Sequence, residues 1–157
     1  MRWVTPERPT IDRIACSWLI LRFIDQQAEF FYVSAERVLP TAIATGAVPY
    51  DIPGVELSRT RKRCSFDAFL AKYHLTDPAL RRLAFIIRGA STSRLDLQPQ
   101  CAGLYAITLG LSAIFSDDHE MLRHGLVLCD ALCAWCARVQ DQKPDRPLIG
   151  KGWICLR

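Results

Sequence analysis

The segment from Thr10 to Asp25 most constrains the fold, because it has the apolar pattern of a core helix and carries charges within that pattern. Its buried stripe follows the 3.6-residue helical period and consists of Ile11, Ile14, Ala15 and Trp18. Thr10 can cap the helix, since its hydroxyl is a good acceptor for the free N–H groups of a first turn. Asp12 and Arg13 lie three or four residues from Cys16, so a carboxylate, a guanidinium and a thiol share one end of a helix.

The first turn of this predicted helix is a candidate oxyanion site. A helix start presents free backbone N–H groups and a partial positive charge, and Arg13 adds a guanidinium. A purely structural interpretation stays open, in which Asp12 offsets the helix dipole, Arg13 is solvated and Cys16 packs as a small apolar residue. The spacing alone does not choose between the two.

Composition indicates one globular domain. The chain has 157 residues, of which 50% are apolar and 23% charged, so it can bury a core without a disulfide or a metal. We expect the domain to span residues 1–140, followed by a tail at residues 141–157 that contains several Pro and Gly. The net charge of +4 is mild, and no run of arginines interleaved with aromatic residues occurs, so direct nucleic-acid binding is not expected.

The N-terminus and the cysteines favour a reducing compartment. Residues 1–8 lack the apolar stretch of a signal peptide, and the longest apolar run, residues 102–115, is too short to span a bilayer. Seven cysteines at irregular spacing favour free thiols over a disulfide framework. We therefore predict a cytoplasmic protein with no membrane partner.

Hydrophobic periodicity predicts a predominantly helical α+β domain, with five or six helices packed on a small sheet of about three short strands. The predicted strands are residues 2–5, 29–33 and 55–58, where aromatic and β-branched residues cluster. Later helices are predicted at residues 35–45, from Ser65 to about residue 73, and from Pro78 to Gly89. Residues 99–115 are apolar nearly all round, which predicts a central buried helix, and a long last helix follows to about residue 140.

The last predicted helix contains three cysteines and a carboxylate. Cys129, Cys133 and Cys136 have a spacing that can hold an iron–sulfur cluster in a glycine-rich loop. Here they follow the apolar stripe of a helix, so we predict that they are buried, reduced and without a metal. Asp130 interrupts the same apolar stretch, and a buried carboxylate needs a partner, most simply an arginine.

Three further positions are candidates for chemistry. Four cations between Arg59 and Arg63 precede Cys64, and they would lower the pKa of an exposed thiol there and make it the most reactive cysteine. A solvated basic loop is the alternative. Arg88 lies at a helix end, where it either binds an anion or offsets the helix dipole. The histidines lack metal-ligand spacing, and His119, at the start of the last helix, is retained as a weak metal candidate.

A set of collinear motifs resembles the bacterial chromate-resistance protein family. They are Trp3-Val4-Thr5, Ile11-Asp12-Arg13-Ile14-Ala15-Cys16, Arg22-Phe23-Ile24-Asp25, Asp51-Ile52-Pro53-Gly54-Val55-Glu56, Asp77-Pro78-Ala79-Leu80, Ile87-Arg88-Gly89-Ala90, Ala102-Gly103-Leu104 and Asp130-Ala131-Leu132-Cys133-Ala134-Trp135. The similarity covers roughly residues 2–140. It corresponds to the domain at the C-terminal end of ChrB-type chromate regulators, which elsewhere occurs on its own or beside a sulfurtransferase domain.

The resemblance implies a role in resisting or sensing chromate, a tetrahedral dianion. We therefore expect a domain that binds a small oxyanion through guanidinium groups, which satisfy two oxyanion oxygens at once. The expected anion contacts are Arg13, Arg22 and Arg88. The carboxylates expected to hold them in place, or to transfer protons, are Asp12, Glu56 and Asp130. Because the chain begins at Met1 with the shared domain, we expect no preceding DNA-binding part and no binding to an operator.

Two rival hypotheses remain. One is an oxidoreductase in which Cys16 or Cys64, as a thiolate, or a bound metal passes electrons to the oxyanion. In the family pattern a histidine often stands where this chain has Arg59, three residues after Glu56, so Glu56 is also only a weak metal candidate. The other is a module that regulates a separate protein by contact, or that forms a homo-oligomer. The residues specify no cofactor, and they do not decide whether the chain is an enzyme.

Overall fold

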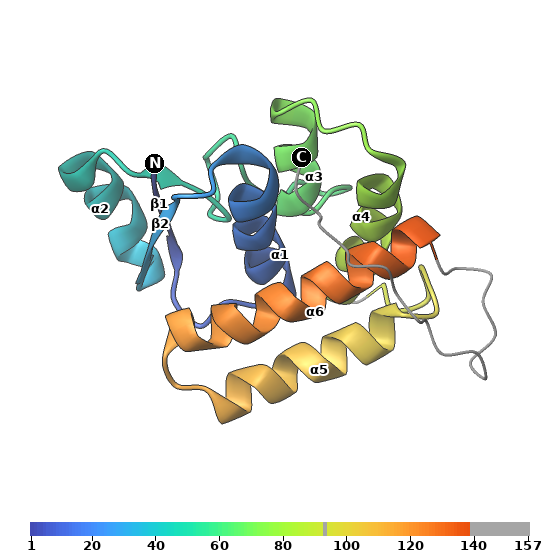
Figure 1. Cartoon of the computed structure of the whole chain (residues 1–157). Coiled ribbons are helices and arrows are strands. Elements are labelled where there is room, and N and C mark those ends of the chain that lie inside the picture. Colours follow the sequence, from blue (N-terminus) through green and yellow to red (C-terminus); the bar gives the residue numbers. More distant parts are fainter. Residues whose placement is uncertain (93, 139–157) are drawn as a thin grey trace.

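The computed structural model describes residues 1–92 and 94–138, so the predicted tail at residues 141–157 lies outside the described residues. In these residues six α-helices pack with a small three-stranded sheet, which confirms the predicted helical α+β class (Figure 1). No helix of this described part is both long and apolar enough to cross a membrane.

The sheet contains three parallel strands in the order β2-β1-β3, with β1 (Arg2–Pro6) in the centre. β2 (Glu29–Val33) pairs along the whole of β1, and β3 (Val48–Pro49) pairs only with its middle. The first two predicted strands are confirmed, but the strand predicted at residues 55–58 is wrong. That segment folds back instead, because the Asp51 N–H donates to the Leu57 carbonyl at 2.9 Å and Gly54 adopts a φ of 86°.

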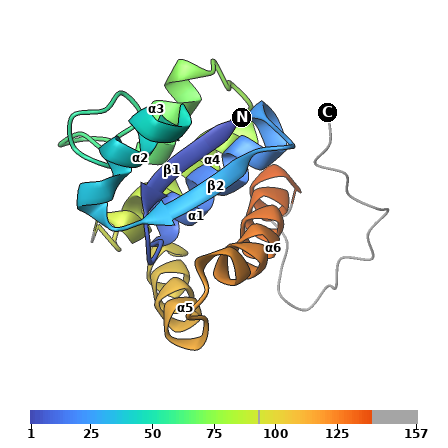
Figure 2. The same cartoon turned by 90° about the vertical axis from the view of Figure 1, so that its left-hand side faces the viewer.

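The central helix is α1 (Ile11–Leu19), in which every residue except Arg13 is buried. It continues as a π-helix, η1 (Ile20–Ile24), so together they cover most of the predicted helical segment. Thr10 occupies the N-cap position with an extended backbone, but its side chain makes no capping hydrogen bond. Figure 2 shows β1 and β2 side by side in front of α1, which is why Trp3 and Phe30 share one hydrophobic core with this helix.

Further helices agree with the sequence patterns. A short 3-10 turn, η2 (Ala35–Arg37), leads into α2 (Val38–Thr45), which packs on the other face of the sheet through a small second core. α3 (Ser65–Lys72) and α4 (Pro78–Ser91) follow, and Asp77 caps α4 by accepting from the Ala79 N–H at 2.7 Å. α6 (Asp118–Arg138) is the long last helix, and the part predicted beyond residue 138 lies outside the described residues.

The helix predicted to be central and buried at residues 99–115 is instead peripheral. It forms α5 (Cys101–Ile114), whose only buried residues are Cys101, Leu104 and Thr108. α5 lies beside α6 at one side of the molecule, and its outer face is open (Figure 1). The exposed apolar residues of α5 form two groups about half a turn apart, with Ile107 and Ile114 on one flank and Tyr105 and Leu109 on the other. An all-round apolar sequence therefore did not indicate which side of the helix is covered.

α6 packs tightly against α1 at a glycine. A Cβ atom at Gly125 would lie 2.4 Å from Cγ2 of Ile14, so no larger residue fits without displacement. This close contact brings α6 and α1 together, and it buries Cys129 and Cys133 in the main core. The predicted burial of the cysteines in the last helix is confirmed, including Cys136.

Candidate functional site

Asp51 gathers polar groups beside the start of α1. Nε of Arg13 donates to its Oδ2 at 2.7 Å, Oγ of Ser65 donates to its Oδ1 at 2.6 Å, and Nη2 of Arg59 lies 3.5 Å from Oδ1. The Asp51 side chain is fully buried, and its backbone φ of 55° lies in the left-handed region, which aspartate adopts more readily than most residues other than glycine. Sequence analysis did not assign Asp51 to the site, although a carboxylate in a turn-rich loop was a usable signal.

The Asp12 side chain binds the start of α3, whereas the Arg13 side chain pairs with Asp51. The Asp12 carboxylate accepts the backbone N–H of Ser65 at 2.9 Å and of Phe66 at 3.0 Å, which are the first two residues of α3. Burial is the main cause that raises the pKa of Asp12, and the nearby carboxylate of Asp51 raises it further. The residue therefore joins two helices that are far apart in the sequence.

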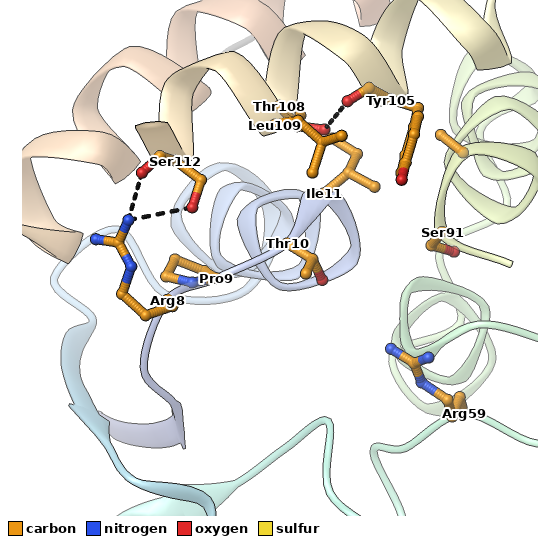
Figure 3. Close-up of a pocket in the computed structure, with 11 residues that line it drawn as sticks. Arg8, Pro9, Thr10, Ile11, Arg59, Ser91, Tyr105, Thr108, Leu109 and Ser112 are labelled. Carbon is orange, nitrogen blue, oxygen red and sulfur yellow. Dashed lines mark hydrogen bonds between the residues drawn. The ribbon is translucent and has the colours of Figure 1, made fainter. Parts of the chain in front are cut away.

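A cavity of about 160 Å³ opens at the start of α1 (Figure 3). Its walls come from α1, from the end of α4 and from α5, and its polar and charged lining consists of Arg8, Thr10, Arg59, Ser91, Tyr105, Thr108 and Ser112. The first bond within α1 runs from the Ile14 N–H to the Thr10 carbonyl, so the three preceding N–H groups have no acceptor inside the helix. Arg13 does not line this cavity, and Arg59 does.

Arg88 belongs to a second ion pair, on α4. Its Nε and Nη2 donate to the two carboxylate oxygens of Asp67 on α3, at 2.9 and 2.6 Å. The same carboxylate accepts the backbone N–H of Cys64 at 3.0 Å. Asp12 and Asp67 thus both accept backbone N–H groups at the start of α3. The first turn of α3 therefore lies between the start of α1, where Arg13 is, and the Arg88 ion pair on α4.

Arg22 lies elsewhere, against α6. Its Nε and Nη2 donate to Asp130 at 3.0 and 2.8 Å, and the indole N–H of Trp18 donates to the same carboxylate at 2.7 Å. Partial burial raises the pKa of Asp130, but these hydrogen bonds outweigh it and leave the pKa below its usual value. The expectation that Asp130 has an arginine partner is confirmed. Arg13, Arg22 and Arg88 therefore pair with three different carboxylates, and none of the three lines the cavity at the start of α1.

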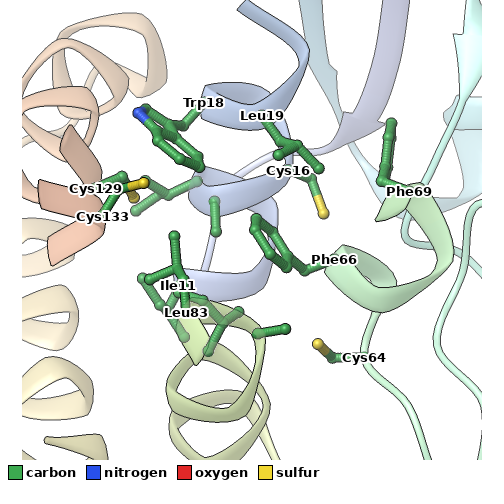
Figure 4. Packing of buried hydrophobic residues seen from close by; sticks show 14 of the residues in the cluster. Ile11, Cys16, Trp18, Leu19, Cys64, Phe66, Phe69, Leu83, Cys129 and Cys133 are labelled. Atoms are coloured by element: carbon green, nitrogen blue, oxygen red, sulfur yellow. The ribbon is translucent and has the colours of Figure 1, made fainter. Parts of the chain in front are cut away.

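The two candidate redox thiols are buried (Figure 4). Cys16 is fully inaccessible, and burial followed by the Asp12 carboxylate raises the pKa of its thiol well above the usual value. Burial is also the main cause that raises the pKa of Cys64, and the carboxylates of Asp12 and Asp67 add to it. The sequence predicted a lowered pKa for an exposed Cys64, and the structure differs because the side chain turns away from the basic loop into the core.

The weak metal candidates lie in different surroundings. Glu56 is largely exposed and forms an ion pair with Lys72. The His119 ring packs edge-on against Tyr32, with 5.1 Å between the ring centres. Within residues 1–92 and 94–138, no group of three or more His, Cys, Asp or Glu side chains has a geometry suited to a metal ion.

The fold and these contacts define a small α+β domain whose helix start opens on an arginine-lined cavity. The family model described as "ChrB, C-terminal domain" matches residues 3–136, and the chain therefore belongs to the family of ChrB C-terminal domains. Protein ChrB of Cupriavidus metallidurans is 29% identical over 132 residues, which cover 83% of this chain and 39% of that protein. The chain thus spans about two fifths of the length of this curated relative. No solved structure matches the chain. Membership in this family supports an association with chromate resistance.

Proposed function

We propose that this domain binds a small oxyanion, such as chromate or sulfate, in the cavity at the start of α1. The observation that carries the proposal is the cavity itself, which combines the free N–H groups of a helix start with the guanidinium of Arg59. Its volume of about 160 Å³ is well above the ~10–15 Å³ that one water molecule requires, so a tetrahedral ion has room.

Arg59 is the guanidinium best placed to contact the anion. Its only polar contact with a described residue is the 3.5 Å approach to Asp51, and Arg13 already neutralises that carboxylate at 2.7 Å. Arg8 also lines the cavity, but its guanidinium is held by carbonyl oxygens near the end of α5, including that of Phe115 at 2.9 Å. Arg8 also forms an ion pair with Asp118, in which Nη1 lies 3.6 Å from Oδ1, so a carboxylate already balances its charge. Arg13 positions Asp51 and through it Arg59.

The apolar part of the cavity strengthens this interaction. Ile11, Tyr105 and Leu109 line it together with the charged groups, and an apolar wall lowers the local dielectric. A charge-assisted hydrogen bond in such surroundings contributes about 1.5–3 kcal/mol. Loss of the Arg59 guanidinium is therefore expected to weaken anion binding by about ten- to a hundredfold.

Calorimetric titration with sulfate and with chromate tests this proposal. Arg59→Ala should show the full loss, and Arg59→Lys should recover part of it, because an ammonium keeps the charge without the planar fork. Arg61→Ala is the matched control, since Arg61 is an exposed arginine of the same loop that does not line this cavity. Equal affinities for the wild type and a folded Arg59→Ala variant would remove this cavity from the function.

The oxidoreductase hypothesis receives no support from the thiols, because Cys16 and Cys64 are buried and their raised pKa values disfavour thiolates.

The interaction-module hypothesis is favoured by one separate observation, the open face of α5. Residues 97–116 contain no charged side chain, so a second copy of the chain could cover this face without burying a charge. Self-association through α5 is therefore the second candidate function.

A further inference from the structure

A second cavity, of about 490 Å³, lies between the loop before α3, α3 itself and α4. Its charged lining consists of Arg63, Asp67, Arg81 and Arg88, and His74, from the turn after α3, also lines it. It shares no lining residue with the cavity at the start of α1. It is therefore a separate site, and the oxyanion proposal above does not account for it.

The guanidinium groups of this cavity outnumber its carboxylate. Asp67 is occupied by Arg88 through two hydrogen bonds, which fixes Arg88 in place. The side chains of Arg63 and Arg81 make no hydrogen bond or ion pair with any residue in the described part of the chain. Three guanidinium groups facing one carboxylate leave an excess of two positive charges in an open cavity, and this excess favours a ligand with more than one negative charge.

The end of α3 does not oppose such a ligand. The last carbonyl groups of a helix carry partial negative charge when they lack donors. Here the N–H groups of Tyr73 and Leu75 each donate at 3.0 Å, to Phe69 and Leu70 respectively. These two carbonyl oxygens therefore already have donors.

The arrangement of the arginines favours a ligand with several anionic groups. Arg81 and Arg88 lie seven residues, or about two helical turns, apart on α4, and Arg63 comes from the loop before α3. A chain of linked phosphates presents a separate anionic group to each guanidinium, which a single tetrahedral ion does not. The cavity is bounded by several short segments, so it suits a compact molecule better than an extended polymer.

We propose that this second cavity binds an oligophosphate chain. Arg63 and Arg81 are its direct contacts, and Arg88 is a third cation whose guanidinium Asp67 holds in place. Calorimetric titration of the full chain with tripolyphosphate tests the proposal. Arg81→Ala and Arg63→Ala should each weaken binding by about tenfold or more, as expected for the loss of a charge-assisted contact. Orthophosphate should bind much more weakly than tripolyphosphate in this cavity.

Two further variants make the result specific. Arg123→Ala removes the same charge from an exposed position on α6 that lines neither cavity, and it should change the tripolyphosphate affinity by no more than about twofold. Arg59→Ala should leave tripolyphosphate binding intact even where it abolishes sulfate binding, so the two proposals fail independently. Equal losses in Arg81→Ala and Arg123→Ala, no tripolyphosphate binding, or tighter binding of a single-stranded oligonucleotide lost in the same variants would each overturn the assignment.

Discussion

Asp12 connects α1 to α3, and its replacement tests whether this connection stabilises the fold. The carboxylate is fully buried and accepts two backbone N–H groups, from Ser65 and Phe66. In Asp12→Ala both N–H groups stay buried without an acceptor. Each buried unsatisfied donor costs about 1–3 kcal/mol, and the relief of burying a charge offsets part of that sum.

The expected net loss for Asp12→Ala is about 2–4 kcal/mol of unfolding free energy. For a domain of this size each kcal/mol lowers Tm by about 2–4 °C, so Tm should fall by about 5–15 °C. Asp12→Asn keeps one acceptor oxygen and should lose about half as much. Asp96→Ala is the control, because its ion pair with Arg94 is largely exposed to solvent and its loss should leave Tm nearly unchanged.

Circular dichroism monitors the urea and thermal unfolding of the wild type and the three variants at several pH values. The pKa of Asp12 is raised above its usual 3.8, so the folded state binds the proton more tightly than the unfolded state. The stability that this group contributes is therefore present below about pH 4 and is lost as the pH rises through its folded pKa. The advantage of the wild type over Asp12→Asn should shrink as the pH rises above about 4 and through the raised pKa of Asp12. An Asp12→Ala variant as stable as the wild type, or an advantage that grows with pH, would refute the reasoning.

Two other predictions follow from burial and exposure. Cys16 and Cys64 should resist alkylation by iodoacetamide in the native protein and react once it is unfolded, as read by peptide mass spectrometry; rapid native labelling of either thiol would contradict their burial. Sedimentation velocity should show that the chain self-associates at about 100 µM and that Ile107→Asp on α5 disrupts this, whereas Ile43→Asp on α2, also at an exposed isoleucine, does not. A wild type that stays monomeric would exclude α5 as a homo-oligomer surface.

The sequence by itself determined the features that depend on local periodicity and end signals. The apolar stripe of α1, the proline and aspartate that begin α4, and the burial of Cys129 and Cys133 all follow from spacing along one helix. The collinear motifs likewise indicated the family, because they preserve order along the chain. Each of these signals lies within a single segment.

Only the tertiary structure decided which charged groups meet. Arg13 and Arg59 converge on Asp51, which lies 38 residues after Arg13, and Arg88 meets Asp67 across 21 residues. No local period encodes such pairs, since the folded core brings them together and buried carboxylates then take the nearest donors. For the same reason α5 could not be placed from its sequence: an all-round apolar helix has no polar face to orient it, so packing against α4 and α6 alone chose which side is buried.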